Sequence, residues 1–294
     1  MSTEIGNQTR KPLAVITGGS SGIGATFARR LAPDHDLLLI ARRKERLEQL
    51  AAELSRTYGS HVEVMTADLT VEQDLAALTE RLETAKDLAL LVNNAGFGSR
   101  GRFWESPIET QEQMHRLHVM APLRLTHAAL RDMVLHDFGG IINVASVAAF
   151  VRSSGSTSYC STKTWMTVFT ETLHLELRSI RSNVVVQALC PGYTYSEFHD
   201  TLGVNREKLA PRSFWLTSDE VVDASLAGLR QRKLFVIPGW RYRVLTSLMS
   251  KVPTRLRLAL EAATTKARSG GQLTPSKREP AAIGQSGPDQ ARDR

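Results

Sequence analysis

The sequence predicts an α/β protein in which a doubly wound parallel sheet of the Rossmann type forms a single domain. Three features of the 294 residues support this prediction. Short apolar segments alternate with segments of helical periodicity from residue 12 to residue 240, which is the pattern of successive βα units. A glycine-rich turn follows the first apolar segment. Apolar residues make up 42% of the chain, which is enough to fill one substantial core.

The predicted strands are apolar throughout rather than alternating, because helices cover both faces of a parallel sheet. About seven such segments occur, and each is short enough to be a strand rather than a helix. They are residues 13–17, 37–41, 61–66, 88–93, 140–145, 183–189 and 234–237.

The predicted helices lie between these strands. In the first of them, Ile23, Phe27 and Leu31 recur at helical spacing and define the face that packs on the sheet. The last helix has Ser218 or Asp219 as its expected N-cap. Residues 193–217 lack either periodicity, and we expect them to form a substrate lid. The predicted helices are residues 22–31, 43–58, 71–82, 109–136, 157–181 and 218–231.

The regions flanking this domain differ from it in composition. Residues 1–11 contain no apolar stretch and are expected to be a flexible N-terminus. Residues 241–268 form a basic, amphipathic helical segment, and residues 269–294 are rich in Gly, Ser, Pro, Gln and charge. A segment with so few apolar side chains cannot offset the entropy of ordering, so 269–294 is predicted to be a disordered tail.

The positive charge of the chain is local. The net charge is +7, yet residues 1–229 hold 23 basic and 26 acidic residues, a net of −3. Residues 230–268 hold ten basic residues and one acidic residue, a net of +9. A nucleic-acid-binding protein usually carries basic stripes on its folded body, so no nucleic-acid partner is expected.

The basic segment has an apolar stripe at helical spacing that includes Val244, Leu245 and Leu248. This pattern is compatible with peripheral contact with an anionic membrane through residues 241–262. The alternative interpretation, which we favour, is that the segment packs across the substrate cleft or a subunit interface.

Cysteine content and hydropathy bear on the compartment. Cys160 and Cys190 are too few for a disulfide framework, and the N-terminus lacks a signal-like apolar run. No uninterrupted apolar run reaches the roughly 18 residues that a spanning helix needs. We therefore expect a cytoplasmic protein, with no metal ion in its site.

The glycine-rich turn between the first strand and the first helix is suited to binding a pyrophosphate. Glycine lets the backbone approach the phosphates, and the free amides and positive end of the next helix favour their charge. By itself such a loop is equally compatible with a merely tight turn. The residues concerned are Thr17-Gly18-Gly19-Ser20-Ser21-Gly22-Ile23-Gly24.

Tyr159 and Lys163 are suited to acid–base chemistry. They lie four residues apart in a predicted helix, so they share one face. A free tyrosine has a pKa of about 10, and a neighbouring ammonium is expected to lower it. Alone, such a pair more often belongs to a solvated helix face, but here it follows the glycine-rich loop and other motifs in one chain.

Taken together, these motifs resemble the short-chain dehydrogenase/reductase family over about residues 12–240. The resemblance rests on the glycine-rich loop, Asn93-Asn94-Ala95-Gly96 and Tyr159-x-x-x-Lys163. Asp68-Leu69, Ser146 and Pro191-Gly192 match further family positions. The resemblance implies a doubly wound sheet, a nicotinamide coenzyme, hydride transfer between the coenzyme and a carbonyl or secondary alcohol, and a homodimer or homotetramer.

The family pattern also implies roles for individual residues. Tyr159 would exchange the proton, Ser146 would hydrogen-bond the substrate oxygen, and Lys163 would tune Tyr159 and hold the nicotinamide ribose. The residues implied in coenzyme binding are Gly18, Ser20, Ser21, Gly22, Ile23, Gly24, Arg42, Arg43, Asp68, Leu69, Asn94, Ala95, Gly96, Tyr159, Lys163, Pro191, Gly192 and Thr194.

One position departs from the family pattern. Where relatives usually have asparagine, this chain has His118 in the sequence His118-Val-Met-Ala121. The family asparagine supports a helix bend whose carbonyl takes part in the proton relay. We weigh two roles for His118, a titrating member of the relay and a passive support of the helix, and favour the second.

The end of the second strand bears on coenzyme choice. NAD-preferring relatives place an acid there, whereas this chain has Arg42 and Arg43. Guanidinium groups bind a 2′-phosphate with charge-assisted hydrogen bonds, so NADP(H) is predicted over NAD(H). The alternative is that these arginines are only surface charge.

The substrate is less constrained by the sequence. Ser146, Tyr193 and Phe198 are the predicted substrate contacts, and the aromatic residues indicate an apolar pocket wall. A membrane-binding C-terminal segment would favour a lipophilic substrate. The alternative function is a non-catalytic NADP-binding protein in which His118 marks a lost relay and the basic segment serves a partner or membrane.

Overall fold

The computed structural model describes residues 11–197 and 210–253, together with 255–256 and 258–259. Within them one sheet of seven parallel strands has the order β3-β2-β1-β4-β5-β6-β7, as the sequence predicted. The strands are β1 (Leu13–Thr17), β2 (Asp36–Ala41), β3 (Val62–Thr66), β4 (Leu88–Asn93), β5 (Gly140–Val144), β6 (Val185–Leu189) and β7 (Phe235–Val236). The N-terminus predicted to be flexible, the predicted C-terminal tail and Phe198 lie outside the described residues, apart from Lys11.

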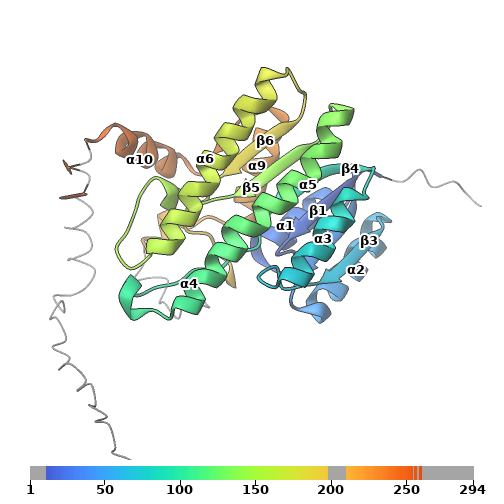
Figure 1. Cartoon of the computed structure of the whole chain (residues 1–294), viewed down its shortest axis with the longest axis horizontal. Coiled ribbons are helices and arrows are strands. Elements are labelled where there is room, and N and C mark those ends of the chain that lie inside the picture. Colours follow the sequence, from blue (N-terminus) through green and yellow to red (C-terminus); the bar gives the residue numbers. More distant parts are fainter. Residues whose placement is uncertain (1–10, 198–209, 254, 257, 260–294) are drawn as a thin grey trace, which may run out of the picture.

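Helices cover both faces of this sheet (Figure 1). Side chains of α1 (Gly22–Leu31), α2 (Lys44–Tyr58) and α9 (Ser218–Arg230) meet the sheet on one face, where Phe27, Leu47 and Val221 are fully buried. On the other face lie α3 (Glu72–Glu83), α5 (Ala121–His136) and α6 (Thr157–Ser179). Burial on both faces explains why the central strands contain almost only aliphatic residues.

The region predicted as one helix at 109–136 is divided into three parts. It consists of α4 (Ile108–His115), a π-helical turn η2 (Arg116–Met120) and α5. Pro122 stands in the first turn of α5. Because proline has no N–H, the carbonyl of His118 lacks the donor that an uninterrupted α-helix would supply. The irregular turn therefore falls at the residue that departs from the family pattern.

One further local prediction needed correction. The N-cap of α9 is Thr217 rather than Ser218 or Asp219, because Thr217 and Glu220 form a reciprocal capping box. In the C-terminal helix α10 (Trp240–Lys251), Tyr242 and Thr246 are buried, whereas the predicted apolar stripe is only partly covered. Val244 and Leu248 remain 49% and 59% exposed.

The remaining short elements lie in connections at the carboxyl side of the sheet. They are the 3-10 turns η1 (Phe103–Glu105), η3 (Val147–Ala149) and η4 (Arg212–Phe214). Turn η3 begins directly after Ser146, whose side chain accepts the amide of Ala148 at 3.1 Å. The backbone around Ser146 is therefore fixed by its own side chain.

Candidate active site

The predicted site residues meet at one edge of the sheet. Each motif directly follows the carboxyl end of a strand: the glycine-rich loop follows β1, Asn94 to Gly96 follow β4, and Ser146 follows β5. In a parallel sheet these ends lie side by side, and ligands bind where neighbouring crossovers diverge. Strands β1 and β4 are such neighbours. The topology therefore brings together segments that are far apart in the sequence.

The glycine-rich loop has the shape of a phosphate cradle. Gly18 and Gly22 adopt φ values of +69° and +53°, in the left-handed region that favours glycine. A Cβ on Gly24 would lie 2.2 Å from the Gly18 carbonyl oxygen. The side chain of Ser21 does not cap α1, and the first turn of α1 contains no acidic residue. The cradle thus fits the pyrophosphate of a dinucleotide.

Asn94 holds this cradle in place. Its side-chain amide donates to the carbonyl oxygens of Thr17 and Gly18 at 2.9 and 3.2 Å. The Thr17 hydroxyl in turn accepts the amides of Asn94 and Ala95 at 2.9 and 3.0 Å. The loops after β1 and β4 are consequently one hydrogen-bonded unit, and Asn94 supports the loop as well as bordering the site.

The two arginines after β2 have different surroundings. The Arg43 guanidinium donates to the hydroxyls of Ser20 and Ser21 at 3.1 and 2.8 Å and to Glu197 at 2.7 Å. Arg42 is 76% exposed and lies 3.7 Å from Asp68. Arg43 is therefore held over the glycine-rich loop, whereas Arg42 is directed toward the segment after β3.

Asp68 and Leu69 have separate roles in the structure. Burial raises the pKa of Asp68, but hydrogen bonds from Thr70 and the charge of Arg42 outweigh it, so the pKa lies below its ordinary value. Leu69 is 4% exposed and belongs to the apolar core. Asp68 is thus a charged carboxylate at the predicted adenine position, whereas the side chain of Leu69 packs in the core.

Ser146, Tyr159 and Lys163 come together as predicted. The Tyr159 hydroxyl is hydrogen-bonded to Ser146. Lys163, 5% exposed, donates from Nζ to the Val144 carbonyl oxygen at 2.8 Å. Its Nζ lies 5.9 Å from the centre of the Tyr159 ring. The helix α6 therefore presents both side chains to the end of β5.

The pKa of Tyr159 does not follow the sequence-based expectation. We expected the Lys163 ammonium to lower it, but burial raises the pKa of Tyr159 to about 12, with the Ser146 hydrogen bond opposing that rise. Burial also lowers the pKa of Lys163 to about 8. Desolvation disfavours the charged form of each group. In this pocket Tyr159 is consequently a protonated hydroxyl at neutral pH.

His118 lies fully buried between the coenzyme-side loop and α6. Its Nε2 accepts the Phe97 amide at 3.1 Å, and its Nδ1 lies 3.1 Å from the Thr162 hydroxyl, which donates to the Tyr159 carbonyl oxygen at 3.1 Å. An acceptor at Nε2 assigns the proton to Nδ1. Burial, followed by the charge of Lys163, holds the pKa of His118 well below its ordinary value.

Gly96 and His118 also depend on one another. A Cβ on Gly96 would lie 2.8 Å from Nε2 of His118. The imidazole therefore occupies the space that a larger residue at position 96 would need. This packing links the Asn-Asn-Ala-Gly motif to the π-helical turn.

The turn after β6 contains the predicted coenzyme contacts Pro191, Gly192 and Thr194 and the predicted substrate contact Tyr193. The Pro191 carbonyl oxygen accepts the Val147 amide at 3.0 Å, which joins this turn to the residue after Ser146. Thr194 is buried and donates to the Gly192 carbonyl oxygen at 3.1 Å. Tyr193 packs against Trp215 with a centroid distance of 5.4 Å. Phe198, the other predicted aromatic contact, lies outside the described residues.

The sequence did not point to three residues that contact these motifs: Thr162, Glu197 and Tyr242. Each acts through a partner distant in the sequence. Glu197 is the clearest example, because its carboxylate contacts both Arg43 and Arg46, and these hydrogen bonds lower its pKa to about 2. Thr162 alone had a local signal, since it precedes Lys163.

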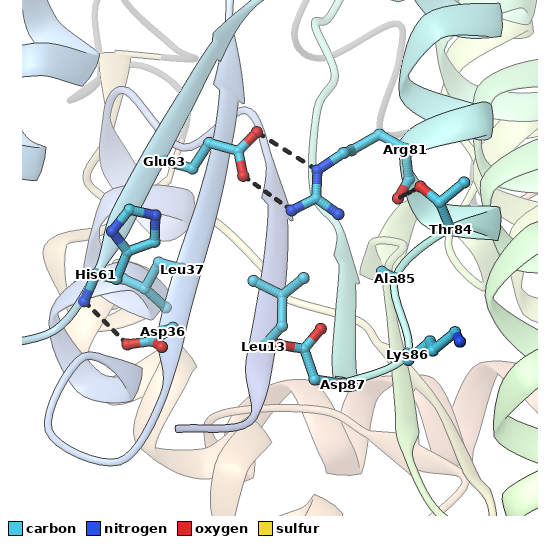
Figure 2. Close-up of a pocket in the computed structure, with 10 residues that line it drawn as sticks. All are labelled: Leu13, Asp36, Leu37, His61, Glu63, Arg81, Thr84, Ala85, Lys86 and Asp87. Atoms are coloured by element: carbon cyan, nitrogen blue, oxygen red, sulfur yellow. Dashed lines mark hydrogen bonds and ion pairs between the residues drawn. The ribbon is translucent and has the colours of Figure 1, made fainter. Parts of the chain in front are cut away.

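A pocket lies at the opposite edge of the sheet (Figure 2). It is lined by first residues of strands, such as Leu13 and Asp36, and by residues after α3, such as Lys86. Figure 2 shows Arg81 and Glu63 facing one another across it, at 2.9 Å. No predicted site residue lines this pocket.

Comparison with known proteins identifies the class. The family profile described as short chain dehydrogenase matches residues 12–207. The chain belongs to this family. It is therefore an oxidoreductase that binds a nicotinamide coenzyme and acts between CH–OH and C=O groups.

Solved structures and relatives support the same class. A short-chain dehydrogenase from Sphingobium yanoikuyae in complex with NADPH is 37% identical, covers 83% of this chain and 97% of that one, and has a TM-score of 0.74. The bulky-bulky ketone specific alcohol dehydrogenase from Comamonas testosteroni is 33% identical, with coverage of 84% and 96% and a TM-score of 0.71. The very-long-chain 3-oxoacyl-CoA reductase of Anas platyrhynchos is 28% identical over 206 residues, 68% of this chain and 65% of the relative.

Among the described helices, none combines the length and the apolar character that crossing a bilayer requires.

Proposed function

We propose that this protein is an NADPH-dependent reductase of lipophilic ketones or aldehydes. The observation that carries the proposal is the buried cluster of Ser146, Tyr159 and Lys163 beside a glycine-rich dinucleotide cradle. These residues have the chemical groups and the arrangement that carbonyl reduction needs.

The residues divide the chemistry as follows. Ser146 orients and polarises the carbonyl oxygen, and Tyr159 gives it a proton from its hydroxyl. When bound, the coenzyme supplies hydride from C4 of its nicotinamide. Lys163 holds the ribose hydroxyls and the position of Tyr159. His118, neutral and hydrogen-bonded on both nitrogens, supports the loop and α6 rather than exchanging protons.

The proposed direction rests on the protonation of Tyr159. With a pKa of about 12, its hydroxyl is protonated at neutral pH. A protonated donor is the form that reduction needs, whereas alcohol oxidation needs a proton acceptor. The protonated hydroxyl is compatible with carbonyl reduction, which is also the direction that the proposed use of NADPH favours.

The proposed NADPH preference rests on Arg42 and Arg43. Arg43 lies over Ser20 and Ser21, and Arg42 is open to solvent. No acid stands at the end of β2 to accept ribose hydroxyls and repel a 2′-phosphate. The NADPH complex of the Sphingobium protein is compatible with this preference.

The proposed substrate class rests on the residues around the β6 turn and on the relatives. Tyr193 and Tyr195 both pack against Trp215 there, with centroid distances of 5.4 and 5.0 Å. Names of similar proteins include a bulky-bulky ketone specific enzyme and very-long-chain 3-oxoacyl-CoA reductases. Together they favour a bulky, apolar carbonyl compound.

The first experiment is a fluorescence titration with NADPH and with NADH, followed by NADPH oxidation with aldehydes, ketones, quinones, steroids and 3-ketoacyl thioesters. We expect NADPH to bind at least about tenfold more tightly, the effect of one or two charge-assisted hydrogen bonds. Within each class, rates are expected to rise with apolar size. Tighter NADH binding would contradict the coenzyme preference, and a preference for small polar carbonyls would contradict the substrate class.

A non-catalytic nucleotide-binding protein is the competing function. It would bind NADPH without turning over any member of the panel. The intact Ser146, Tyr159 and Lys163 cluster argues against it.

A homodimer or homotetramer is the proposed assembly. Several apolar side chains on the outer faces of α5 and α6 support it: Leu135 is 78% exposed, and Leu175 is 60% exposed. Light scattering after size exclusion tests this proposal, and a monomeric mass at micromolar concentration would exclude it. We also propose a cytoplasmic location.

Peripheral membrane contact through the segment 241–262 is a further part of the proposal. In the described part of this segment, Val244 and Leu248 are exposed. Trp240, directly before the segment, is also exposed, so the three side chains follow one another at four-residue spacing. Arg241 lies over the Trp240 ring at 4.8 Å. Basic and apolar groups together suit an anionic bilayer.

Co-sedimentation with phosphatidylserine vesicles and with phosphatidylcholine vesicles tests this contact. The wild type is expected to pellet with the anionic vesicles, and the variant with Trp240→Ser and Leu248→Ser is not. Protein that stays wholly in the supernatant would remove the proposal.

A further inference from the structure

The C-terminal helix α10 has one buried aromatic residue directed toward the active site. Tyr242 is 3% exposed, whereas Trp240 on the same helix is 60% exposed. The helix lies on the side of the molecule opposite to β3 (Figure 1). Its inner face therefore differs in character from its outer face.

The Tyr242 hydroxyl joins the two ends of the connection between β6 and α9. It accepts the Tyr193 amide at 2.9 Å, and it donates to the Phe214 carbonyl oxygen at 2.6 Å. Its ring also meets the Phe214 ring edge-on at 5.7 Å. One side chain thus makes hydrogen bonds to two residues, Tyr193 and Phe214, that lie 21 positions apart in the sequence.

The same two ends are also joined by backbone hydrogen bonds. Leu216 donates to the Tyr193 carbonyl oxygen, and Tyr195 donates to that of Leu216, both at 2.9 Å. The Tyr242 hydroxyl lies at this junction and adds to it. Burial raises the pKa of Tyr242 to about 12, so the hydroxyl keeps the proton that it needs to donate while also accepting.

Gly192 makes the space for the Tyr242 ring. A Cβ on Gly192 would lie 2.0 Å from the ring carbon Cζ. Gly192 is not among the glycines of positive φ, so the requirement is for space rather than for an unusual backbone angle. The family motif Pro191-Gly192 thus has a partner in a helix outside the core fold.

This junction borders the catalytic serine. The Pro191 carbonyl oxygen accepts the amide of Val147, the residue after Ser146, at 3.0 Å. A shift of Gly192 and Tyr193 would therefore act directly on the wall next to Ser146. No contact between Tyr242 and the Ser146, Tyr159 and Lys163 cluster is needed for this effect.

We propose that Tyr242 is a positioning residue for the reaction, which holds both ends of the β6 to α9 connection against Gly192 beside Ser146. The segment after the Rossmann core is then part of the active-site structure. It acts on the turn after β6, where the predicted substrate contact Tyr193 lies, and leaves the glycine-rich cradle after β1 unchanged.

The first test compares Tyr242→Phe with the wild type. Loss of the hydroxyl removes the acceptor of the Tyr193 amide and the donor to the Phe214 carbonyl, both partly buried, so we expect KM for the best carbonyl substrate of the panel to rise about tenfold. The pH profile of kcat should stay the same, because the substitution leaves the Ser146, Tyr159 and Lys163 cluster intact. Tyr58→Phe, which removes a hydroxyl from a half-exposed side chain on α2, is the matched control.

A structural readout makes the test independent of turnover. Amide hydrogen exchange in peptides covering 190–197 and 210–217 is expected to accelerate in Tyr242→Phe, while peptides of β1 do not change. Unchanged exchange at the junction, or a loss of kcat, NADPH binding and thermal stability together without a selective KM effect, would overturn the proposal.

A double-variant cycle tests the packing on Gly192. Gly192→Ala alone should raise KM and accelerate exchange at the junction, because the added methyl collides with the ring. In a Tyr242→Ala background the same change should add little, since the ring is gone. Equal effects of Gly192→Ala in both backgrounds would show that Tyr242 does not set the requirement for glycine.

Discussion

The two edges of the sheet each contain a basic side chain, and the pKa values of these two side chains are shifted in opposite directions. At the carboxyl edge Lys163 is buried with a neutral carbonyl partner, and burial lowers its pKa to about 8. At the amino edge Arg81 is partly exposed and paired with Glu63, which raises its pKa further. Burial without an opposite charge makes proton transfer easier, whereas pairing near solvent fixes the charge. The comparison explains why the carboxyl edge is the reactive one.

The largest expected effect is that of Tyr159→Phe. Removal of the proton donor should lower kcat by about a thousandfold, within the usual range for a general acid. The phenyl ring still fills the pocket, so NADPH affinity should remain within about twofold. Steady-state kinetics and a coenzyme titration measure the two quantities. Retention of most of the turnover would show that Tyr159 is not the proton donor.

The next largest effect is expected for His118→Leu. It leaves the Phe97 amide without its acceptor and removes one of the two partners of the Thr162 hydroxyl, so we expect a loss of about 2–3 kcal/mol in the free energy of unfolding. His118→Asn retains an amide that can accept and donate, and it should cost less.

The pH profile separates support from proton transfer at His118. Because its pKa lies well below the ordinary value, the imidazole stays neutral above pH 6.5 in the folded state. The kcat profile of His118→Asn should therefore keep the shape of the wild-type profile. If the kcat of His118→Asn lost a pH dependence that the wild type shows near neutral pH, His118 would titrate in the reaction.

Lys163 should make stability depend on pH. Its pKa is lowered to about 8 in the folded state, against about 10.4 when unfolded. At pH values between these two pKa values, the unfolded chain binds more protons than the folded chain. The free energy of unfolding of the wild type should therefore rise with pH relative to that of Lys163→Met. This added stability is lost as pH falls through about 8. The slope of the difference approaches about 1.4 kcal/mol per pH unit. Urea unfolding at several pH values measures it, and a flat difference would contradict the burial argument.

Arg43→Ala should have a smaller and more selective effect. Loss of its charge-assisted hydrogen bonds should weaken NADPH binding about tenfold and NADH binding less. Arg46→Ala is the control, because Arg46 shares Glu197 with Arg43 but donates to neither Ser20 nor Ser21 in the described contacts. Equal losses in the two variants would show that the effect comes from Glu197 rather than from a phosphate site.

The smallest effect is expected at the amino edge. Glu63→Gln breaks an ion pair whose side chains are 36% and 41% exposed, so the cost should be under about 1 kcal/mol. Kinetic constants should not change, because the pocket of Figure 2 lies at the other end of the strands. A fall in kcat would connect the two edges and weaken the comparison.

Local sequence patterns were sufficient for the parts of the site built by one turn. Gly18, Gly22 and Gly24 lie in a single strand-to-helix turn, and Tyr159 and Lys163 lie on one helical face. Their relative positions follow from backbone geometry over a few residues. The apolar runs similarly predicted all seven strands, because burial on both faces leaves little choice of residue type.

Only the tertiary structure determined the surroundings of these groups. The raised pKa of Tyr159 results from burial, which outweighs the hydrogen bond of Ser146, contrary to the expectation from its spacing to Lys163. The neutral state of His118 depends on Phe97 and Thr162, and the need for Gly192 depends on Tyr242. Each of these pairs spans a crossover or a long connection. Desolvation and packing depend on everything that closes over a group, so they arise when distant segments meet, whereas helical and strand periodicity is present in the chain itself.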